Sequence, residues 1–231
     1  MDFGDRRNVY EIKEVLTNSL TPTMHDSTVI ATYHTGELDS DVWANCQPVH
    51  IKHYWTGELA PSSRHAEARI CWNNDGLTVR FVGAQHEPLV IASDPVTDKK
   101  TIGLWDRDVC EIFIAPQPDK PNDYFEFEAA PTGEWIDLGI RITPTGRETE
   151  WDFASGMTTT SKIEGEQIIV TITIPWSVRI PKPGVGEEWL VNLFRCIGPE
   201  ERTRYLTWCP TKTAEPNFHV PEAFGVLLFN D

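Results

Sequence analysis

The residues best able to do chemistry are concentrated near the middle of the chain, where Trp105 and Asp106 precede Asp108 and Glu111. The alternation in Val109–Ala115 (VCEIFIA) predicts a β-strand, which would hold a large aromatic ring and several carboxylates near its start. The C–H face of a pyranose ring stacks on an aromatic ring, and its hydroxyls bond to carboxylates. The segment therefore predicts a sugar-binding groove; the alternative is a half-buried tryptophan beside solvated acids.

A second acidic strand is predicted at Tyr124–Ala130 (YFEFEAA), where Glu126 and Glu128 share one face and the two phenylalanines share the other. If this strand lies beside the first one, Glu111 comes close to both glutamates. The acidic face then has three interpretations: contacts with sugar hydroxyls, catalysis, or ion pairs with Arg69, Arg80 or Arg141.

Catalysis on this face would take the form of glycoside hydrolysis. That reaction needs two carboxyl groups about 5–5.5 Å apart for retention, or about 6.5–9.5 Å apart for inversion. A sheet face that carries Glu111, Glu126 and Glu128 could provide either spacing. Carboxylates that only accept hydroxyl protons need no tuned pKa, whereas an acid catalyst does.

The charge balance restricts the class of partner. The 231 residues include 20 basic and 35 acidic side chains, which give a formal net charge of −15. Nucleic acids and anionic membranes both attract basic surfaces, so the sequence predicts neither as a partner. Neutral ligands and divalent cations are compatible with this charge, and no apolar stretch is long enough to span a membrane.

The five cysteines are dispersed and include no Cys-x-x-Cys pair; they are Cys46, Cys71, Cys110, Cys196 and Cys209. This odd number predicts buried thiols and neither a disulfide framework nor a zinc site. The first residues, MDFGDRRNVYEIKEV, lack the apolar core of a secretory signal. Together these features favour a cytoplasmic location, and the localisation of a longer precursor is left open.

Period-two patterns predict an all-β fold with about ten strands. The clearest segments are Ala68–Trp72, Leu77–Gly83, Val109–Ala115, Tyr124–Ala130, Trp135–Arg141, Ile168–Ile174, Trp189–Cys196, Thr203–Trp208 and Phe224–Phe229. Turn signals such as Asn73-Asn74-Asp75-Gly76 separate them. Many short strands between such turns predict a single-domain antiparallel β-sandwich of the jelly-roll or Greek-key type.

Little helix is expected. One short helix is predicted near Trp151–Ser155 or Trp176–Val178. The first 35 residues have weaker patterning and are predicted to form an N-terminal extension that wraps the sandwich. No repeat or low-complexity tract divides residues 1–231, so one domain is predicted.

Four segments taken together resemble the family 9 carbohydrate-binding modules, which are DOMON-like β-sandwiches. They are Leu104–Pro116 (LWDRDVCEIFIAP), Tyr124–Trp135 (YFEFEAAPTGEW), Ile172–Trp176 (ITIPW) and Asn217–Phe229 (NFHVPEAFGVLLF). Gly36–Trp43 (GELDSDVW) and Ala68–Phe81 also match, so the resemblance spans roughly residues 35 to 231. It implies a sandwich that binds sugars of glucan or xylan type and does not cleave them.

The resemblance also assigns roles to individual residues. Trp105 stands at the first aromatic clamp position, and Phe218 stands at or near the second, where the family commonly has tryptophan. Glu111 matches a carboxylate that bonds to sugar hydroxyls. Glu126 replaces a basic hydrogen-bonding residue, which is a departure from the family pattern.

Further polar residues complete the predicted ligand site: Asp108, Glu128, Asn217 and His219. No cofactor is required, but structural calcium is predicted as an option in the Asp-rich turn. Asp39 and Asp41 are its candidate ligands, because hard cations take clustered oxygen donors. The alternative is that this turn uses its aspartates only for local hydrogen bonds.

Family resemblance implies a carbohydrate ligand and a role in polysaccharide catabolism beside a glycoside hydrolase partner. The second hypothesis is that the chain is itself a glycoside hydrolase using paired glutamates. A third is a haem- or redox-binding sandwich, which needs paired Met and His ligands; Met24 and Met157 are the only internal methionines. The oligomeric state is left open.

Overall fold

The computed structural model describes residues 27–231, which form fourteen β-strands and very little helix. The strands are β1 (Thr28–Tyr33), β2 (Val49–Ile51), β3 (His53–Tyr54), β4 (Ala66–Trp72), β5 (Gly76–Ala84), β6 (Val109–Ala115), β7 (Asp123–Ala129), β8 (Trp135–Thr143), β9 (Gly146–Glu150), β10 (Thr158–Glu164), β11 (Gln167–Pro175), β12 (Glu188–Cys196), β13 (Tyr205–Thr207) and β14 (Gly225–Asn230). The helical elements are α1 (Ser40–Asn45) and the 3₁₀ turns η1 (Ser62–Arg64), η2 (Leu104–Asp106) and η3 (Pro221–Ala223).

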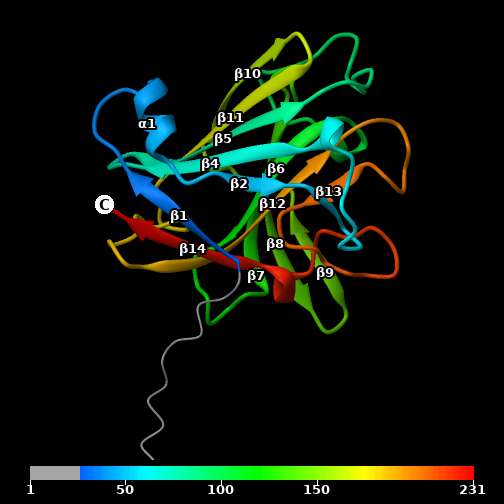
Figure 1. The fold of residues 1–231 in the computed structure, drawn as a ribbon. Helices are drawn as coiled ribbons and strands as arrows, with labels where there is room; N and C mark the ends of the chain where they lie inside the picture. The colour runs from blue at the N-terminus through cyan, green and yellow to red at the C-terminus, as the bar shows by residue number, and fades with distance from the viewer. Residues whose placement is uncertain (1–26) are drawn as a thin grey trace, which may run out of the picture.

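All of these strands belong to one hydrogen-bonded sheet that folds over on itself to make two layers (Figure 1). One layer has the order β10-β11-β5-β4, and the other has the order β12-β6-β7-β8-β9. β1 and β14 lie side by side and join the layers at one edge. Among the described residues, every pair is antiparallel except the two that β1 makes with β14 and β4. The predicted all-β sandwich is confirmed.

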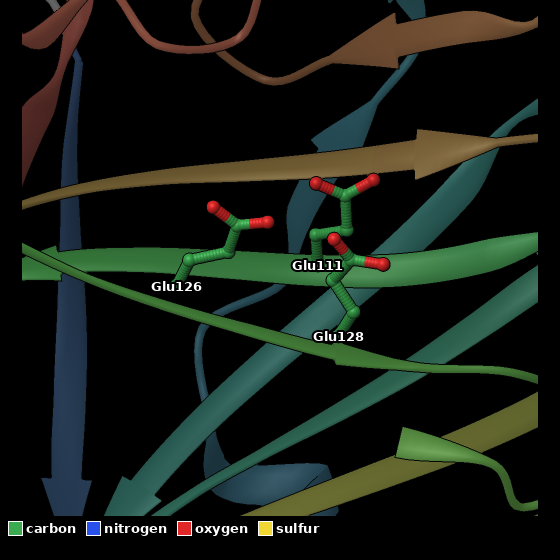
Figure 2. A group of neighbouring side chains, drawn as sticks. All are labelled: Glu111, Glu126 and Glu128. Carbon is green, nitrogen blue, oxygen red and sulfur yellow. The ribbon is translucent and has the colours of Figure 1, made fainter. Parts of the chain in front are cut away.

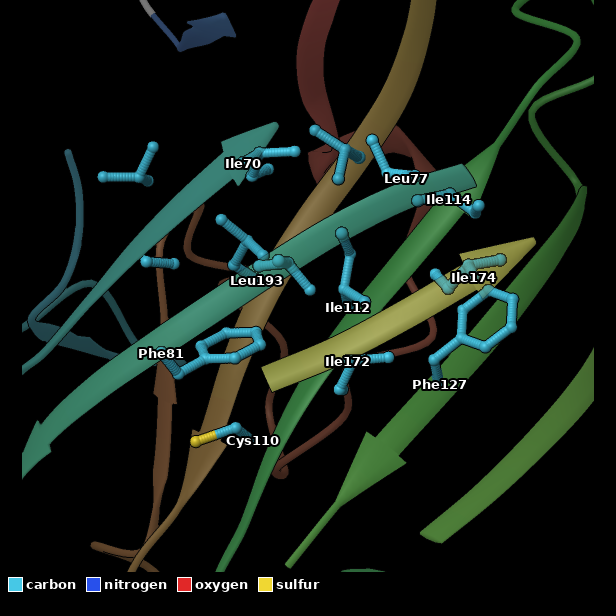
Figure 3. Close-up of a cluster of buried hydrophobic side chains, with 14 of the residues drawn as sticks. Ile70, Leu77, Phe81, Cys110, Ile112, Ile114, Phe127, Ile172, Ile174 and Leu193 are labelled. Atoms are coloured by element: carbon cyan, nitrogen blue, oxygen red, sulfur yellow. The ribbon is translucent and has the colours of Figure 1, made fainter. Parts of the chain in front are cut away.

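The main hydrophobic core lies between the layers (Figure 3). β5 contributes Phe81, β6 contributes Ile112, β7 contributes Phe127 and β11 contributes Ile172, and all four side chains are fully buried. Because side chains alternate along a strand, the residues between them face the other side of their layer. On β6 and β7, those intervening residues include Glu111, Glu126 and Glu128.

Local sequence explains the turns that fix strand register. In the β4–β5 hairpin, the Asn73 side-chain oxygen accepts the N–H groups of Asp75 and Gly76 at 2.8 and 3.1 Å. A Cβ atom on Gly76 would approach the Ile174 carbonyl oxygen to 2.4 Å, so no other residue fits there without movement. This tight approach lets β5 pair with β11 along its full length.

All nine segments predicted as strands are strands, with ends shifted by a few residues. The predicted count of about ten is too low, because β1, β2, β3, β9 and β10 were not anticipated. β9 and β10 carry mainly exposed polar residues on both faces, so they lack the alternation that marks a half-buried strand.

The helix predictions are wrong. Neither Trp151–Ser155 nor Trp176–Val178 is helical, and the short α-helix is α1 instead. Asp39 caps α1 by accepting the N–H groups of Asp41 and Val42, both at 3.0 Å. The predicted wrapping by residues 1–35 falls mostly on residues 1–26, outside the described part of the chain.

All five cysteines are free and buried, as predicted. Met157 is buried in the core, where it packs as an apolar side chain, and Met24 lies outside the described residues. Within residues 27–231, the structure contains no helix long and apolar enough to cross a membrane.

We expect replacement of Phe127 by alanine to lower the free energy of unfolding by about 3–5 kcal/mol, because it leaves a cavity between the layers. Val178 is fully exposed, so Val178→Ala is the control and should change stability by less than about 0.5 kcal/mol. Urea denaturation of both variants checks this. Equal effects would show that the inter-layer core is not as packed as described.

Candidate functional site

A pocket of about 260 Å³ lies on the face of the β12-β6-β7-β8-β9 layer that points away from the main core. Its floor comes from β6 and β7, and its walls come from β8, β9, β12 and β13. Two loop segments complete the rim: Trp105 of η2 on one side and residues 216–219 on the other. Seven of the eight predicted ligand-binding residues line this pocket: Trp105, Glu111, Glu126, Glu128, Asn217, Phe218 and His219.

Strand register brings the three glutamates together. Glu111 on β6 is directly opposite Glu128 on β7, and Glu126 lies two residues along β7 on the same face. Figure 2 shows their carboxylates projecting to the same side of the two strands. Carboxylate oxygens from all three lie within 4.8 Å of one another. Like charges facing each other across a sheet are unfavourable, so this arrangement is not explained by strand pairing.

Burial makes the cluster still less favourable. Glu128 is completely buried, and Glu111 and Glu126 are each 3% exposed. The Cys196 thiol donates to Oε1 of Glu111 at 3.3 Å. As ionised carboxylates, both oxygens of Glu128 and Oε2 of Glu126 have no hydrogen-bond partner; a proton on one of the two residues lets Glu126 and Glu128 bond to each other. Buried carboxylates are normally paired, so these unsatisfied oxygens require an explanation.

The environment raises the pKa of all three carboxyl groups. Burial is the main cause at Glu111, and the neighbouring Glu126 adds to it, which raises the Glu111 pKa to about 8. Burial also raises the pKa of Glu126. For Glu128, burial and then the charges of Glu111 and Glu126 raise the pKa well above its usual range. At neutral pH, protonated carboxyl groups can donate as well as accept hydrogen bonds.

The predicted ion pairs with arginines do not form. Arg69 pairs with Glu67, and Arg141 pairs with Asp123. Arg80 lies over the ring of Trp43 at 5.7 Å. The basic side chain that does line the pocket is the exposed Arg147 on β9, and sequence reasoning missed it because β9 was not anticipated.

His219 forms part of the pocket wall beside the glutamates. Its Nδ1 is hydrogen-bonded to the Tyr124 hydroxyl at 2.8 Å, and its ring lies 5.3 Å from the ring of Phe113. Its Nε2 is 3.9 Å from Oε2 of Glu126. Burial, with a smaller effect from Arg147, lowers the His219 pKa to about 3. The imidazole is therefore neutral at physiological pH and does not compensate a glutamate charge.

The two predicted clamp residues, Trp105 and Phe218, both line the pocket, and each also contacts another aromatic ring. Phe218 is 8% exposed and stacks on Phe194 with ring centroids 4.0 Å apart. Trp105 instead neighbours Trp151, with centroids 6.3 Å apart and planes tilted by 44°. Trp151 follows the unpredicted strand β9 and is 45% exposed, and sequence reasoning left it open as rim or core. The mouth thus presents a tilted pair of tryptophans, and Phe218 forms an inner wall.

Two of the remaining predicted residues make local contacts. Asn217 lies at the rim, and its side-chain oxygen accepts the N–H of His219 at 2.9 Å. Asp108 does not line the pocket; it is buried and accepts the N–H of Gly198 at 2.8 Å. Its carboxylate also faces Gln85 at 3.4 Å, so it ties the start of β6 to neighbouring loops. Its position does not support a ligand contact.

Candidate metal ligands lie in a different place from the predicted one. Asp39 and Asp41 are exposed, and Asp39 uses its oxygen to cap α1, so calcium there stays a prediction. In the described part of the chain, one group of acidic side chains is spaced so that it could hold a metal ion. It consists of Glu111, Glu126 and Glu128. It supplies only oxygen donors.

Residues 35–231 match the protein family described as "Carbohydrate family 9 binding domain-like". Because the match covers most of the sequence, the chain belongs to this family. Among proteins with curated descriptions, none matches the chain.

Several solved structures have a similar fold. A putative carbohydrate-binding protein from Bacteroides uniformis superposes with a TM-score of 0.67 and 18% identity, covering 88% of this chain and 99% of that one. A family 9 carbohydrate-binding module from Caldicellulosiruptor kristjanssonii, solved with glucose, has a TM-score of 0.59 and 17% identity, with 88% and 96% coverage. The module solved with cellotriose has a TM-score of 0.60 and 17% identity, with 88% and 94% coverage. At these identities the likeness shows the fold.

We expect the buried glutamates to make stability fall as the pH rises from about 5 to 8. In this window the unfolded chain has lost the Glu111 proton, because a free glutamate titrates near 4.5, whereas the folded chain keeps it up to about pH 8. The folded state then binds more protons, and each such group lowers the free energy of unfolding by up to about 1.4 kcal/mol per pH unit. Denaturation at several pH values in EDTA should show a flatter profile for Glu111→Gln.

Glu148→Gln is the matched control, because Glu148 is exposed on β9 and should leave the slope unchanged. The same pH slope in wild type and Glu111→Gln would contradict the described burial of this carboxyl group.

Proposed function

We propose that this pocket binds the terminal sugar of a neutral glucan- or xylan-like oligosaccharide without cleaving it. The observation that carries the proposal is the meeting, in one cavity, of two indole rings, the half-buried Trp105 and the exposed Trp151, with convergent carboxyl groups. Indole rings take the apolar face of a sugar, and the carboxyl groups take its hydroxyls. Family membership and the glucose and cellotriose complexes of the Caldicellulosiruptor module add support.

The size of the pocket favours one ring. At about 260 Å³, it lies below the range of roughly 300–1,000 Å³ that is typical of sites for drug-sized ligands. Its floor is closed by β6 and β7, so an oligosaccharide would enter by its end. Under the proposal, Trp105 stacks on the terminal ring and Phe218 contacts its edge. Trp151 lies too close to Trp105, at 6.3 Å, for a sugar to fit between them, so it would contact the next ring of the ligand.

The protonation state of the floor glutamates determines which polar contacts they can make with a sugar. Glu111 and Glu126 lie at the floor, where raised pKa values allow a carboxyl group to donate to one hydroxyl and accept from another. Arg147 supplies N–H donors at the rim, and Asn217 and His219 complete it. A lectin-like module of this kind would deliver polysaccharide to a glycoside hydrolase partner in polysaccharide catabolism.

Hydrolysis is the second candidate, because the glutamate oxygens lie within 4.8 Å, close to the spacing of retaining enzymes. Such enzymes need environments that push two carboxyl pKa values apart, one ionised and one protonated. Here burial raises all three, so the environment favours binding.

We expect Trp105→Ala to weaken sugar binding at least about tenfold, which is about 1.4 kcal/mol and matches the loss of one stacking ring with its buried area. Titration calorimetry with glucose, xylose, cellobiose, xylobiose and galactose provides the measurement. Leu59 is exposed outside the pocket, so Leu59→Ala is the control and should bind as wild type does. No saturable heat with any of the five sugars at millimolar concentration would overturn the proposal.

We also expect no release of reducing sugar from xylan or cello-oligosaccharides by wild-type protein. The assay is an end-group measurement on long incubations, run beside Glu126→Gln. Release by wild type that disappears in Glu126→Gln would establish the hydrolase instead and assign Glu126 as a catalytic residue.

A further inference from the structure

We infer that Glu111, Glu126 and Glu128 bind one hard divalent cation, calcium above all, at the floor of the pocket. The inference goes beyond sugar binding and rests on the floor of the pocket; with the cation bound, Glu111 and Glu126 are ionised and meet sugar hydroxyls only as acceptors.

The unsatisfied oxygens are the first argument. In their ionised form, both oxygens of Glu128 and Oε2 of Glu126 are buried without a donor, and a proton shared between Glu126 and Glu128 would satisfy only one contact. No lysine or arginine of the described chain forms an ion pair with any of the three carboxylates. Glu128 is completely buried and projects from β7 toward the other two acids (Figure 2). A cation coordinated by these oxygens would satisfy them directly.

Distance is the second argument. Oxygens on opposite sides of a calcium ion are about 4.6–5.2 Å apart, since each Ca–O bond is about 2.3–2.6 Å. One oxygen from each glutamate can be chosen so that all lie within 4.8 Å of one another. A single calcium ion therefore spans the group without movement of β6 or β7.

Donor type and charge are the third argument. All three ligands are carboxylates, which hard cations prefer, and the nearby Cys196 thiol carries its proton because it donates to Glu111. Soft metals such as zinc or copper therefore find no thiolate here. When a cation displaces their protons, the three glutamates carry −3, and the rim residue Arg147 carries +1. A divalent cation brings this sum to zero, whereas a monovalent ammonium group leaves −1.

The three carboxylates leave some coordination positions of a calcium ion unfilled. Calcium takes six to eight oxygens, and three carboxylates provide between three and six of them. The remaining positions face the cavity of about 260 Å³, where water or ligand oxygens can reach them.

The test uses the full chain after treatment with a chelator, titrated with calcium in a calorimeter and, separately, with terbium. Trp105 and Trp151 line the same pocket and should sensitise terbium emission. We expect one ion per chain, with calcium raising the midpoint of thermal unfolding. Glu128→Gln keeps the shape of the side chain and should weaken calcium binding at least about tenfold; Glu126→Gln is the second variant. Glu148→Gln, an exposed change on β9, is the control and should bind calcium as wild type does.

The inference is overturned if wild type shows no saturable calcium or terbium binding, or if Glu128→Gln binds as well as wild type. A third outcome also overturns it: calcium does not bind, and glucosamine binds to the wild type but not to Glu128→Gln. The floor would then hold an ammonium group. These ion titrations contain no sugar. A failure of the sugar panel therefore leaves them unaffected, and a failure here leaves the sugar proposal standing.

Discussion

The alternation of side chains on β6 and β7 is the constraint on which the site depends. Ile112 and Phe127 face the inter-layer core, and the residues beside them, Glu111 and Glu128, must then face the pocket. A slip of one residue in either strand would move acids into the core and apolar groups into the pocket. Burial of the apolar face therefore fixes the register, and the register forces the glutamates together. Apolar packing offsets the unfavourable burial of the acids.

Among the buried acids of the described chain, the three pocket glutamates stand out because no basic side chain pairs with them. Elsewhere, buried acids have partners: Asp137 pairs with Lys100 and bonds to Ser155, and Glu134 pairs with Arg107. Such departures, held in place by a rigid scaffold, are typical of binding sites, because the groups left unsatisfied are those that a ligand will satisfy. The floor glutamates fit this description.

How much the sequence could predict depends on whether the signal was local. Strands such as β6 and β7 have one apolar face, so alternation identified them and placed Glu126 and Glu128 on one side. β9 is exposed on both faces and gave no such signal, so Arg147 was missed and Trp151 was left undecided. The stacking of Phe218 on Phe194 joins segments distant in sequence, and no local pattern predicts it. Family resemblance found the pocket residues, but not which aromatic pairs would form.

The closed floor and the tilted aromatic mouth together argue for recognition of chain ends. A groove that runs along a flat sheet would accept the interior of a polysaccharide, whereas here β6 and β7 would block passage beneath a sugar bound as proposed. Two parallel rings would grip one sugar from both faces, but the 44° tilt between Trp105 and Trp151 makes a corner instead. Under the proposed function, this corner would support one sugar ring on Trp105 and leave the next against Trp151. The orientation of the ligand would then be set by the floor, because polar contacts with a terminal ring are the ones that fix which hydroxyls it presents.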